Sequence, residues 1–260
     1  LLQANTAQTL YIFTNHGNCY PLAVAKMTEF RPRDRGQLLS GVLADLDEGE
    51  EAMLFVVSEP ALLSEHPDLL FVTRQGMIKR AAAGDYAVRS KKYPAVGLKH
   101  GDELLGIAFA DPAKDLLLVT RRGMSIRFEL SSVPLQGRSA TGVRAMTLET
   151  DDQVFWFGQP GQGDELLLFS DRGWGKRILS MDFEPQKRAG KGVHCFPFNK
   201  NGSNGRYLAG AALLPQSGAQ SLLVHQFRSP ATQIKQNEIL VQGRTGKGMP
   251  YVMAILDDVV

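Results

Sequence analysis

The sequence contains few cysteines and no apolar run long enough to cross a membrane. Only Cys19 and Cys195 occur among the 260 residues, and neither belongs to a C-x-x-C pair. Two isolated cysteines exclude a disulfide framework and a cysteine-based zinc site of ordinary spacing. No apolar run approaches the roughly 18–20 residues of a membrane helix, and no signal-peptide pattern opens the chain. We expect a cytoplasmic protein without membrane contact, and the abrupt start at Leu1 suggests a fragment of a longer chain.

Recognisable catalytic motifs are also absent. The sequence has neither a Gly-x-Ser-x-Gly elbow nor a Gly-x4-Gly-Lys-Ser/Thr phosphate loop. The five histidines lack the spacing of metal ligands, and we interpret them as polar turn or surface residues. Two acidic pairs, Asp151-Asp152 and Asp257-Asp258, fit a turn and a terminal segment better than a Mg²⁺ site. We expect no catalytic residue, no metal and no cofactor in this chain.

The net charge is close to zero, but the charges are unevenly distributed. Lys and Arg number 29 and Asp and Glu 27, for a net charge of +2. A sum this small argues against a strongly basic nucleic-acid-binding protein. However, residues 41–68 carry eight acidic and no basic side chains, whereas residues 71–92 carry six basic and one acidic. Residues 145–165 and 171–192 repeat this contrast, with five acids and no base, then six bases and three acids.

A short apolar run followed by a turn glycine recurs along the chain. The copies are Leu10–Gly17, Leu70–Gly76, Leu117–Gly123 and Leu167–Gly173, and a fifth run, Leu222–Arg228, lacks the glycine. A tight turn after a strand often requires a positive φ, which glycine adopts without steric cost. We therefore interpret these glycines as structural.

A second position stays in step with the first. Gly36, Gly142 and Gly192 each lie 19 residues after the turn glycine of their copy, and Gly248 lies 20 after Arg228. We assign the same position in the second copy to Ala95. Basic, glycine-containing boxes end there in the later copies: Gly137–Gly142, Lys187–Gly192 and Gly243–Gly248. Two motifs kept in register indicate an internal repeat of about 50 residues.

The repeat predicts an all-β protein. Each copy contains short runs rich in Val, Ile, Leu and Phe, separated by Gly, Asp, Asn or Pro, which are strand and turn signals. About four strands in ~40–55 residues is the size of a propeller blade. We predict a single domain over residues 1–260, a propeller-like disc of five to six four-stranded blades. The repeats span about 8–58, 67–112, 114–158, 164–214 and 219–260, and residues 1–7 are the remnant of a preceding blade. An open β-solenoid is the alternative.

Basic residues recur at the same places in each copy, just after the turn glycine and around the second position described above. On a disc, one phase means one position on every blade, so these residues would form a positive band. Such a band suits a phosphate backbone, which is bound through counterion release and without reading bases. The box glycines would also offer backbone N–H groups to phosphates. The predicted DNA-binding residues are Arg74, Lys79, Arg80, Lys91, Lys92, Arg121, Arg122, Arg127, Arg138, Arg144, Arg172, Lys176, Arg177, Lys187, Arg188, Lys191, Arg244 and Lys247.

Two other functions fit a repeat of this kind. A β-propeller protein-interaction module would bind a peptide on its face, and its charges would serve solubility. An enzyme with its site in the propeller channel would need polar or metal-binding residues at one repeat phase, and the sequence shows none.

Several motifs resemble one family. The segments 117–128, 137–144 and 173–177, and the run Lys99–Gly106, are similar to the C-terminal repeats of the A subunit of bacterial type IIA topoisomerases, DNA gyrase and topoisomerase IV. The resemblance covers essentially the whole chain. It implies a β-pinwheel, in which neighbouring blades exchange strands and a basic outer rim bends or wraps duplex DNA. The resemblance also implies a separate core that holds the catalytic tyrosine, and an A subunit that dimerises and pairs with an ATPase B subunit. The whole enzyme would use ATP and Mg²⁺ and would be cytoplasmic, in association with the nucleoid.

The chain departs from the gyrase pattern in one respect. The family's Gln-Arg-Arg-Gly-Gly-Lys-Gly box belongs to the first blade, whereas the nearest text here, Gln186–Gly192, falls in a late copy. We expect a first-blade box to lie upstream of Leu1. The segments Arg31–Gln37 and Arg89–Ala95 look more like topoisomerase IV repeats, which we favour. The first copy, with Asn15–Cys19 at its turn, has lost the basic turn residues.

Overall fold

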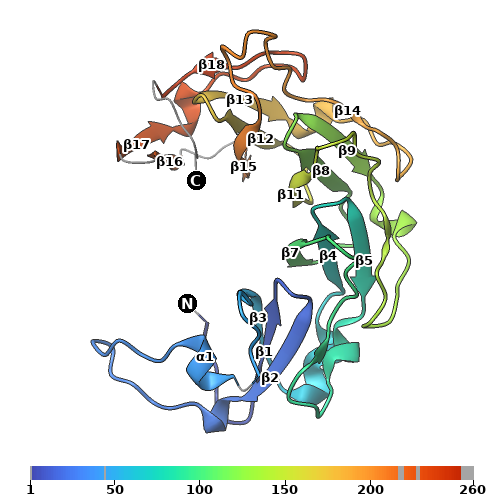
Figure 1. Cartoon of the computed structure of the whole chain (residues 1–260), viewed down its shortest axis with the longest axis vertical. Coiled ribbons are helices and arrows are strands. Elements are labelled where there is room, and N and C mark those ends of the chain that lie inside the picture. The colour runs from blue at the N-terminus through green and yellow to red at the C-terminus, as the bar shows by residue number, and fades with distance from the viewer. Residues whose placement is uncertain (1, 44, 216–219, 227–228, 253–260) are drawn as a thin grey trace. The chain divides into compact units, whose positions relative to one another are not determined.

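A computed structural model describes residues 2–43, 45–215, 220–226 and 229–252. Nearly all regular structure is β-strand (Figure 1), as the sequence predicted. In this described part, no helix combines the length and apolar character needed to span a membrane. The chain divides into two compact units, which comprise residues Leu1–Asp111 with Val133–Val143, and Pro112–Ser132 with Arg144–Val260.

The first unit contains two four-stranded sheets, in the orders β3-β1-β2-β6 and β10-β5-β4-β7. Within them β1 pairs with β2 and β3, and β4 with β5 and β7, all antiparallel. The strands are β1 Thr9–Thr14, β2 Asn18–Ala23, β3 Ala52–Ser58, β4 Leu69–Thr73, β5 Met77–Ala81, β6 Tyr93–Pro94, β7 Leu104–Phe109 and β10 Val143–Arg144.

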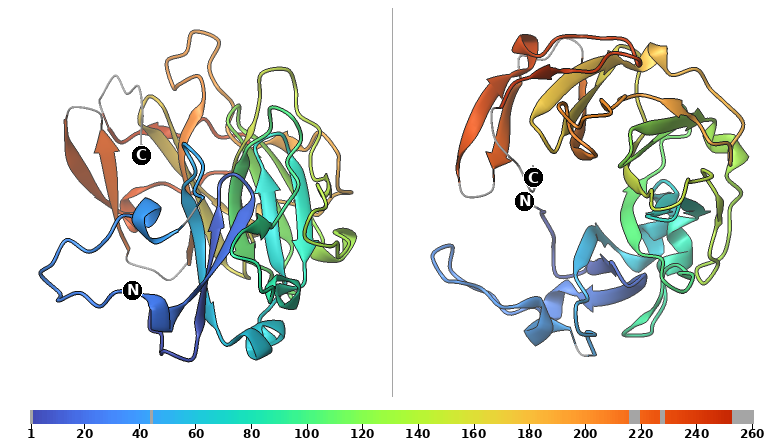
Figure 2. Two further views of the ribbon diagram at one scale, coloured as in Figure 1. Left: turned by 60° about the horizontal axis from the view of Figure 1, so that its bottom comes forward. Right: turned by 45° about the horizontal axis from the view of Figure 1, so that its top comes forward.

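The second unit repeats this arrangement, in the orders β11-β8-β9-β14 and β15-β12-β13-β18, and adds the pair β16-β17. Its strands are β8 Leu116–Thr120, β9 Met124–Phe128, β11 Val154–Gly158, β12 Asp164–Ser170, β13 Trp174–Leu179, β14 Val193–His194, β15 Leu208–Pro215, β16 Ser221–Gln226, β17 Ser229–Lys235 and β18 Met249–Pro250. Both views of Figure 2 show the hairpin β12–β13 with β15 beside it.

In the described residues, helical structure is limited to segments of three to six residues. A 3₁₀ turn follows the second strand of every hairpin, which marks five copies of one unit. These turns are η1 Val24–Lys26, η3 Ala83–Tyr86, η4 Leu130–Ser132, η5 Ser180–Asp182 and η6 Gln236–Glu238; η2 Pro60–Glu65 and the helix α1 Leu39–Val42 lie elsewhere in the first two copies.

Each four-stranded sheet is completed by a two-residue strand from the copy that follows. Thus β14 pairs with β9, and β18 pairs with β13. The carbonyl of the turn glycine Gly123 accepts the N–H groups of Cys195 and Phe196, which follow β14, at 2.8 and 3.1 Å. Gly123 has a φ of 77°, and a Cβ there would collide with the Phe196 carbonyl. The turn glycine therefore serves the predicted tight turn and also receives the donated segment.

This exchange confirms the strand exchange that the family resemblance implied, and it corrects one sequence prediction. The second, third and fourth copies each supply three strands to their own sheet and one to the preceding copy. The Gly17 carbonyl accepts N–H groups from Ala95 and Val96, as Gly123 does from Cys195 and Phe196. Ala95 therefore corresponds to Cys195, three residues after Gly192, and the true second-anchor residue of this copy is Lys92.

Within the second unit, the apolar core joins neighbouring copies. In the second unit, Leu117, Val119, Leu166 and Leu168 belong to one buried cluster, against which Trp156 and Trp174 pack. Both tryptophans therefore contribute to packing in this unit.

The separate antiparallel sheets exclude the solenoid alternative. In the fifth copy the described residues form the pair β16–β17 as their own sheet, the turn η6 and the donated strand β18. The missing turn glycine at Arg228 and the pair Asp257-Asp258 lie outside the described residues. That all copies form one disc-shaped domain stays a prediction.

Candidate nucleic-acid interface

The predicted basic residues separate into three groups by burial. Two are fully buried, Lys79 at 1% and Lys176 at 0% exposure. Neither side chain reaches the surface, so the prediction that Lys79 and Lys176 contact DNA is wrong. Seven are exposed: Lys91, Arg122, Arg144, Arg172, Lys187, Lys191 and Lys247. The remaining nine are half-buried: Arg74, Arg80, Lys92, Arg121, Arg127, Arg138, Arg177, Arg188 and Arg244.

Three half-buried arginines form the same ion pair in successive copies. Arg80 pairs with Asp68 at 2.7 Å and Arg127 with Asp115 at 2.9 Å, and Arg177 pairs with Glu165. In each case the acid lies 12 residues earlier, on or just before the strand that pairs with the arginine's own strand. These arginines hold the blade together, and their charges are largely neutralised within it.

Other half-buried cations are also engaged within the fold. Arg74 pairs with Glu103 at 3.0 Å. The guanidinium of Arg121 lies 4.6 Å from the ring centroid of Tyr207, and that of Arg138 lies 5.1 Å from that of Tyr93. Such stacking fixes the planes of the guanidinium groups but leaves their charges unneutralised.

Four of the seven exposed residues of this set, Arg144, Lys187, Lys191 and Lys247, lie in or beside three loops, which we call the box loops: residues 137–142, 187–192 and 243–248. Each lies immediately before a donated strand, β10, β14 or β18. Their inner sides are tied to the blade. Thr147 donates from N and Oγ1 to the Gly190 and Ala189 carbonyls at 2.9 and 2.8 Å, and Arg244 Nε donates to the Asp182 carbonyl at 2.9 Å. The predicted second position of the repeat therefore falls in a loop before a donated strand, and its contact with DNA stays a prediction.

In the second unit one box loop gathers several predicted residues. Arg188 donates to the carbonyls of Arg144 and Ser132, so Arg144 lies beside the loop that carries Lys187 and Lys191. Lys191 also pairs with Glu149 at 2.8 Å, but both side chains are about two-thirds exposed or more, at 72% and 65%. An exposed pair of this kind is easily exchanged for another anion.

The prediction omitted three exposed arginines of the first copy, Arg31, Arg33 and Arg35. They lie in a loop that extends away from β1 and β2 in Figures 1 and 2. Gly36, at the end of this segment, has a φ of 69°, and no atom would lie within 4 Å of an added Cβ. Gly36 lies 19 residues after Gly17, as Gly142 and Gly192 lie after their turn glycines. This spacing marks the segment as the counterpart of the box loops, although its sequence differs from theirs.

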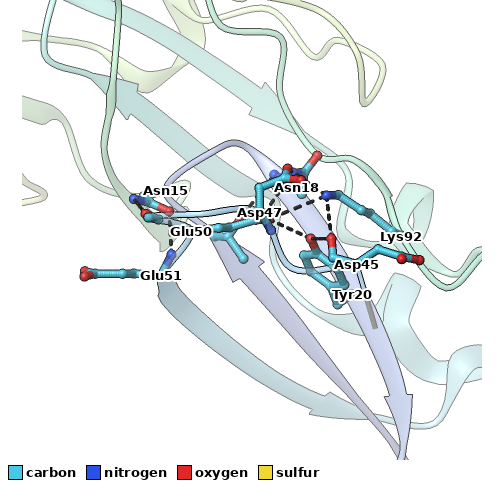
Figure 3. Close-up of polar contacts among 10 residues, drawn as sticks. Asn15, Asn18, Tyr20, Asp45, Asp47, Glu50, Glu51 and Lys92 are labelled. Carbon is cyan, nitrogen blue, oxygen red and sulfur yellow. Dashed lines mark hydrogen bonds and ion pairs between the residues drawn. The ribbon is translucent and has the colours of Figure 1, made fainter. Parts of the chain in front are cut away.

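In the first copy, the buried carboxylate of Glu50 contacts the turn that lacks basic residues (Figure 3). Glu50 accepts hydrogen bonds from Thr14 at 2.5 Å, Asn18 at 2.8 Å and Tyr20 at 2.7 Å. Burial alone would raise the pKa of Glu50, but these hydrogen bonds together lower its pKa to about 2. Burial raises the pKa of the Tyr20 hydroxyl to about 12.

The same cluster contains Lys92, one of the predicted DNA-binding residues. Its ammonium lies 2.8 Å from Asp47 and 3.6 Å from Glu50. Ligand atoms of His16, Asp47 and Glu50 all lie within 4.8 Å of one another. Because Lys92 already neutralises these carboxylates, the cluster is better explained as a structural network than as a metal site. Its charge is directed inward, so Lys92 contributes less to a DNA surface than the box residues do.

The acidic pair Asp151-Asp152 forms part of a turn, as predicted. Asp152 Oδ1 accepts the N–H groups of Arg122 and Gln153 at 3.0 and 2.9 Å, and Asp151 has a φ of 61°. This carboxylate is used to cap the hairpin turn that presents Arg122.

Comparison with known proteins gives a consistent result. The family model "DNA gyrase C-terminal domain, beta-propeller" matches residues 67–111, 114–158 and 164–204. The gyrase A protein of Chlamydia pneumoniae is 29% identical over 252 residues, which cover 96% of this chain and 29% of that protein. The gyrase A protein of Haloquadratum walsbyi is 33% identical over 195 residues, 73% of this chain and 23% of that protein. The chain therefore spans less than a third of the length of these relatives.

Two solved structures are similar over nearly the whole chain. The C-terminal domain of DNA topoisomerase IV superposes with a TM-score of 0.86 at 25% identity, covering 97% of this chain and 77% of the other. A DNA gyrase A C-terminal domain superposes with a TM-score of 0.72 at 22% identity, covering 98% and 81%.

Proposed function

Because the chain belongs to the family of DNA gyrase C-terminal β-propeller domains, we propose that it binds and bends duplex DNA as the non-catalytic domain of a type IIA topoisomerase A subunit. The observation that carries this proposal is that four cations in or beside the box loops, Arg144, Lys187, Lys191 and Lys247, are all exposed. Their side chains are exposed, whereas the predicted cations of the hairpin strands are buried or paired within the blade. Backbone phosphates are the ligand such a surface suits.

We extend the proposal to the whole protein on the same family grounds. The catalytic tyrosine, the dimer contacts and the partner ATPase belong to the remainder of the enzyme, which would use ATP and Mg²⁺. This domain would hold the DNA segment beside that core and support strand passage.

Within the family, we favour a topoisomerase IV-like role, in which DNA is bent without a full wrap. The superposition on the topoisomerase IV domain, at a TM-score of 0.86, supports this preference, although the relatives compared by sequence are gyrase A proteins. This preference is tested by binding the domain to a nicked plasmid, resealing the nick and measuring the linking number. We expect little change in linking number, whereas a large positive shift would indicate gyrase-like wrapping.

Bending itself is tested by cyclisation of a short duplex. Ligation of a fragment of about 150 base pairs, one persistence length, is slow because smooth bending is costly. We expect the domain to accelerate circle formation by at least about tenfold, since a bent duplex would bring more phosphates to the basic loops. Binding without any gain in cyclisation would reduce the proposed function to DNA binding alone, and absence of binding would favour a protein-interaction module.

A further inference from the structure

The two buried lysines lie directly beneath two of the box loops. Lys176 Nζ donates to the carbonyls of Gly243, Arg244 and Gly246 at 3.0, 2.9 and 2.6 Å. Lys79 Nζ donates to the carbonyls of Arg138 and Ala95 at 2.5 and 2.6 Å. Lys176 therefore holds three carbonyls of its box toward the interior of the blade, and Lys79 holds one, together with the Ala95 carbonyl.

This arrangement determines where the N–H groups of the box point. In a trans peptide the C=O of one residue and the N–H of the next point in opposite directions, and the described chain has no cis peptide. Inward carbonyls at 243, 244 and 246 therefore direct the N–H groups of Arg244, Thr245 and Lys247 outward. In the described structure no acceptor is recorded for these three N–H groups. Convergent outward N–H groups are the usual backbone site for an anion.

The third copy provides an internal comparison, because it lacks the buried lysine. Ile126 stands there at the position of Lys79 and Lys176, three residues after the turn glycine. The corresponding box contains Lys187, Arg188 and Lys191, whereas the box above Lys79 contains only Arg138 and that above Lys176 contains Arg244 and Lys247. Fewer charged side chains thus occur in the boxes that rest on a buried ammonium.

The first residue of each box varies in the same way. It is Lys187 above Ile126 but Gly137 and Gly243 above the two lysines. At both glycines an added Cβ would meet no atom within 4 Å, and neither has a positive φ. Packing and backbone conformation therefore do not require glycine there. A missing side chain leaves the neighbouring N–H groups open to a large anion.

We infer that Lys79 and Lys176 are positioning residues, which orient the box backbone so that its N–H groups bind DNA phosphates. The inference rests on the proposed function and adds a second kind of phosphate site to it. Where Ile126 replaces the lysine, box side chains supply the contacts. Where the lysine is present, the backbone supplies part of them.

The proton on Lys176 provides a readout that a purely structural role would lack. Burial lowers the pKa of Lys176 to about 8. The groups that face it are the Arg244 guanidinium, the Cys195 thiol, whose pKa is raised by burial, and the Phe196 ring at 5.5 Å. A neutral amine donates only two hydrogen bonds, so one of the three box carbonyls loses its partner as the pH rises past 8. DNA affinity should then fall.

Unfolding would not explain that loss. The folded pKa lies below the ordinary value of 10.5, so the unfolded chain binds the proton more tightly between about pH 8 and 10.5. In that window this group makes the folded state more stable as the pH rises. Loss of affinity with no loss of stability is therefore the expected signature.

The test uses Lys176→Met in the whole chain, with Lys187→Ala as the matched control. Lys176 is buried, so its replacement leaves the exposed charge of the box loops unchanged. We expect duplex affinity at pH 7 to fall about tenfold, the scale of losing hydrogen bonds to a charged group, with an unchanged salt slope. The step near pH 8 should also disappear, whereas the titration of Lys79, whose pKa burial lowers to about 7, should remain. Lys187→Ala should instead lower the salt slope by about one and keep the step.

Each other outcome overturns a defined part of the account. Wild-type affinity in a folded Lys176→Met chain, or a slope lowered as in the control, would refute the positioning role alone. Should Lys176→Met fail to fold, Lys176→Ile, which copies Ile126, serves as the second variant. The wild-type pH profile needs no variant, and a flat profile from pH 7 to about 9 would likewise refute the role. Absence of duplex binding by the wild type would overturn the proposed function together with this inference.

Discussion

Raising the salt concentration from about 50 to about 200 mM is expected to weaken duplex binding by on the order of 10³–10⁵-fold, if roughly six to ten phosphates are engaged. Seven predicted cations are exposed, and the loop with Arg31, Arg33 and Arg35 adds more. Each contact releases condensed counterions, and this entropic gain falls as bulk salt rises. Anisotropy titrations of a labelled duplex of about 40 base pairs at several salt concentrations measure the slope.

The near-zero net charge makes this result informative. A chain with a net charge of +2 would show little salt dependence if its charges were mixed evenly over the surface. A steep slope therefore requires that the basic residues act as a separate set. A flat response would contradict DNA backbone binding and would favour a protein ligand.

Replacing Lys187 and Lys191 together by Ala is expected to weaken duplex binding by roughly 10- to 100-fold and to lower the salt slope by about two. Both side chains are exposed in one box loop. Arg188 is left in place, because its hydrogen bonds to the Arg144 and Ser132 carbonyls anchor that loop. Since phosphate contacts carry no sequence information, two duplexes of unrelated sequence should lose affinity equally.

The matched control removes two exposed lysines at the other phase of the repeat. Lys99 and Lys200 lie in the turns after the donated strands, four and five residues beyond the matching positions Ala95 and Cys195. The double variant Lys99→Ala, Lys200→Ala changes the net charge by the same amount. We expect its affinity and slope to stay near wild type. Equal losses in both double variants would mean that total charge matters and phase does not.

Much of the fold could be predicted because the repeat is recorded in local residues. A turn glycine needs a particular φ, and an apolar run is needed for each buried strand, so both leave a pattern in the sequence. The exchange of strands leaves a weaker pattern in the sequence. The donated strand Tyr93–Pro94 has only two residues, and the position before it is Lys92 rather than glycine, which is why Ala95 was assigned in its place.

The candidate site could be predicted only at the level of repeat phase. Arg80, Arg127 and Arg177 each follow an acid by 12 residues, a spacing that the sequence shows and that indicates an internal pair. Lys79 lies between Ile78 and Arg80 on a strand whose two faces are both largely buried. Alternation along the strand therefore could not show that its side chain points inward. The direction of the box N–H groups depends on carbonyl contacts with another copy, which no local pattern records.

Chemical footprinting of lysines tests the central claim most directly. The chain is treated with an acetylating reagent with and without saturating duplex, and the modification of each lysine is measured by mass spectrometry. The account predicts strong protection of Lys187, Lys191 and Lys247, which are exposed in box loops, and none at Lys99 and Lys200. Protection of Lys99 and Lys200 with unprotected box lysines would contradict it.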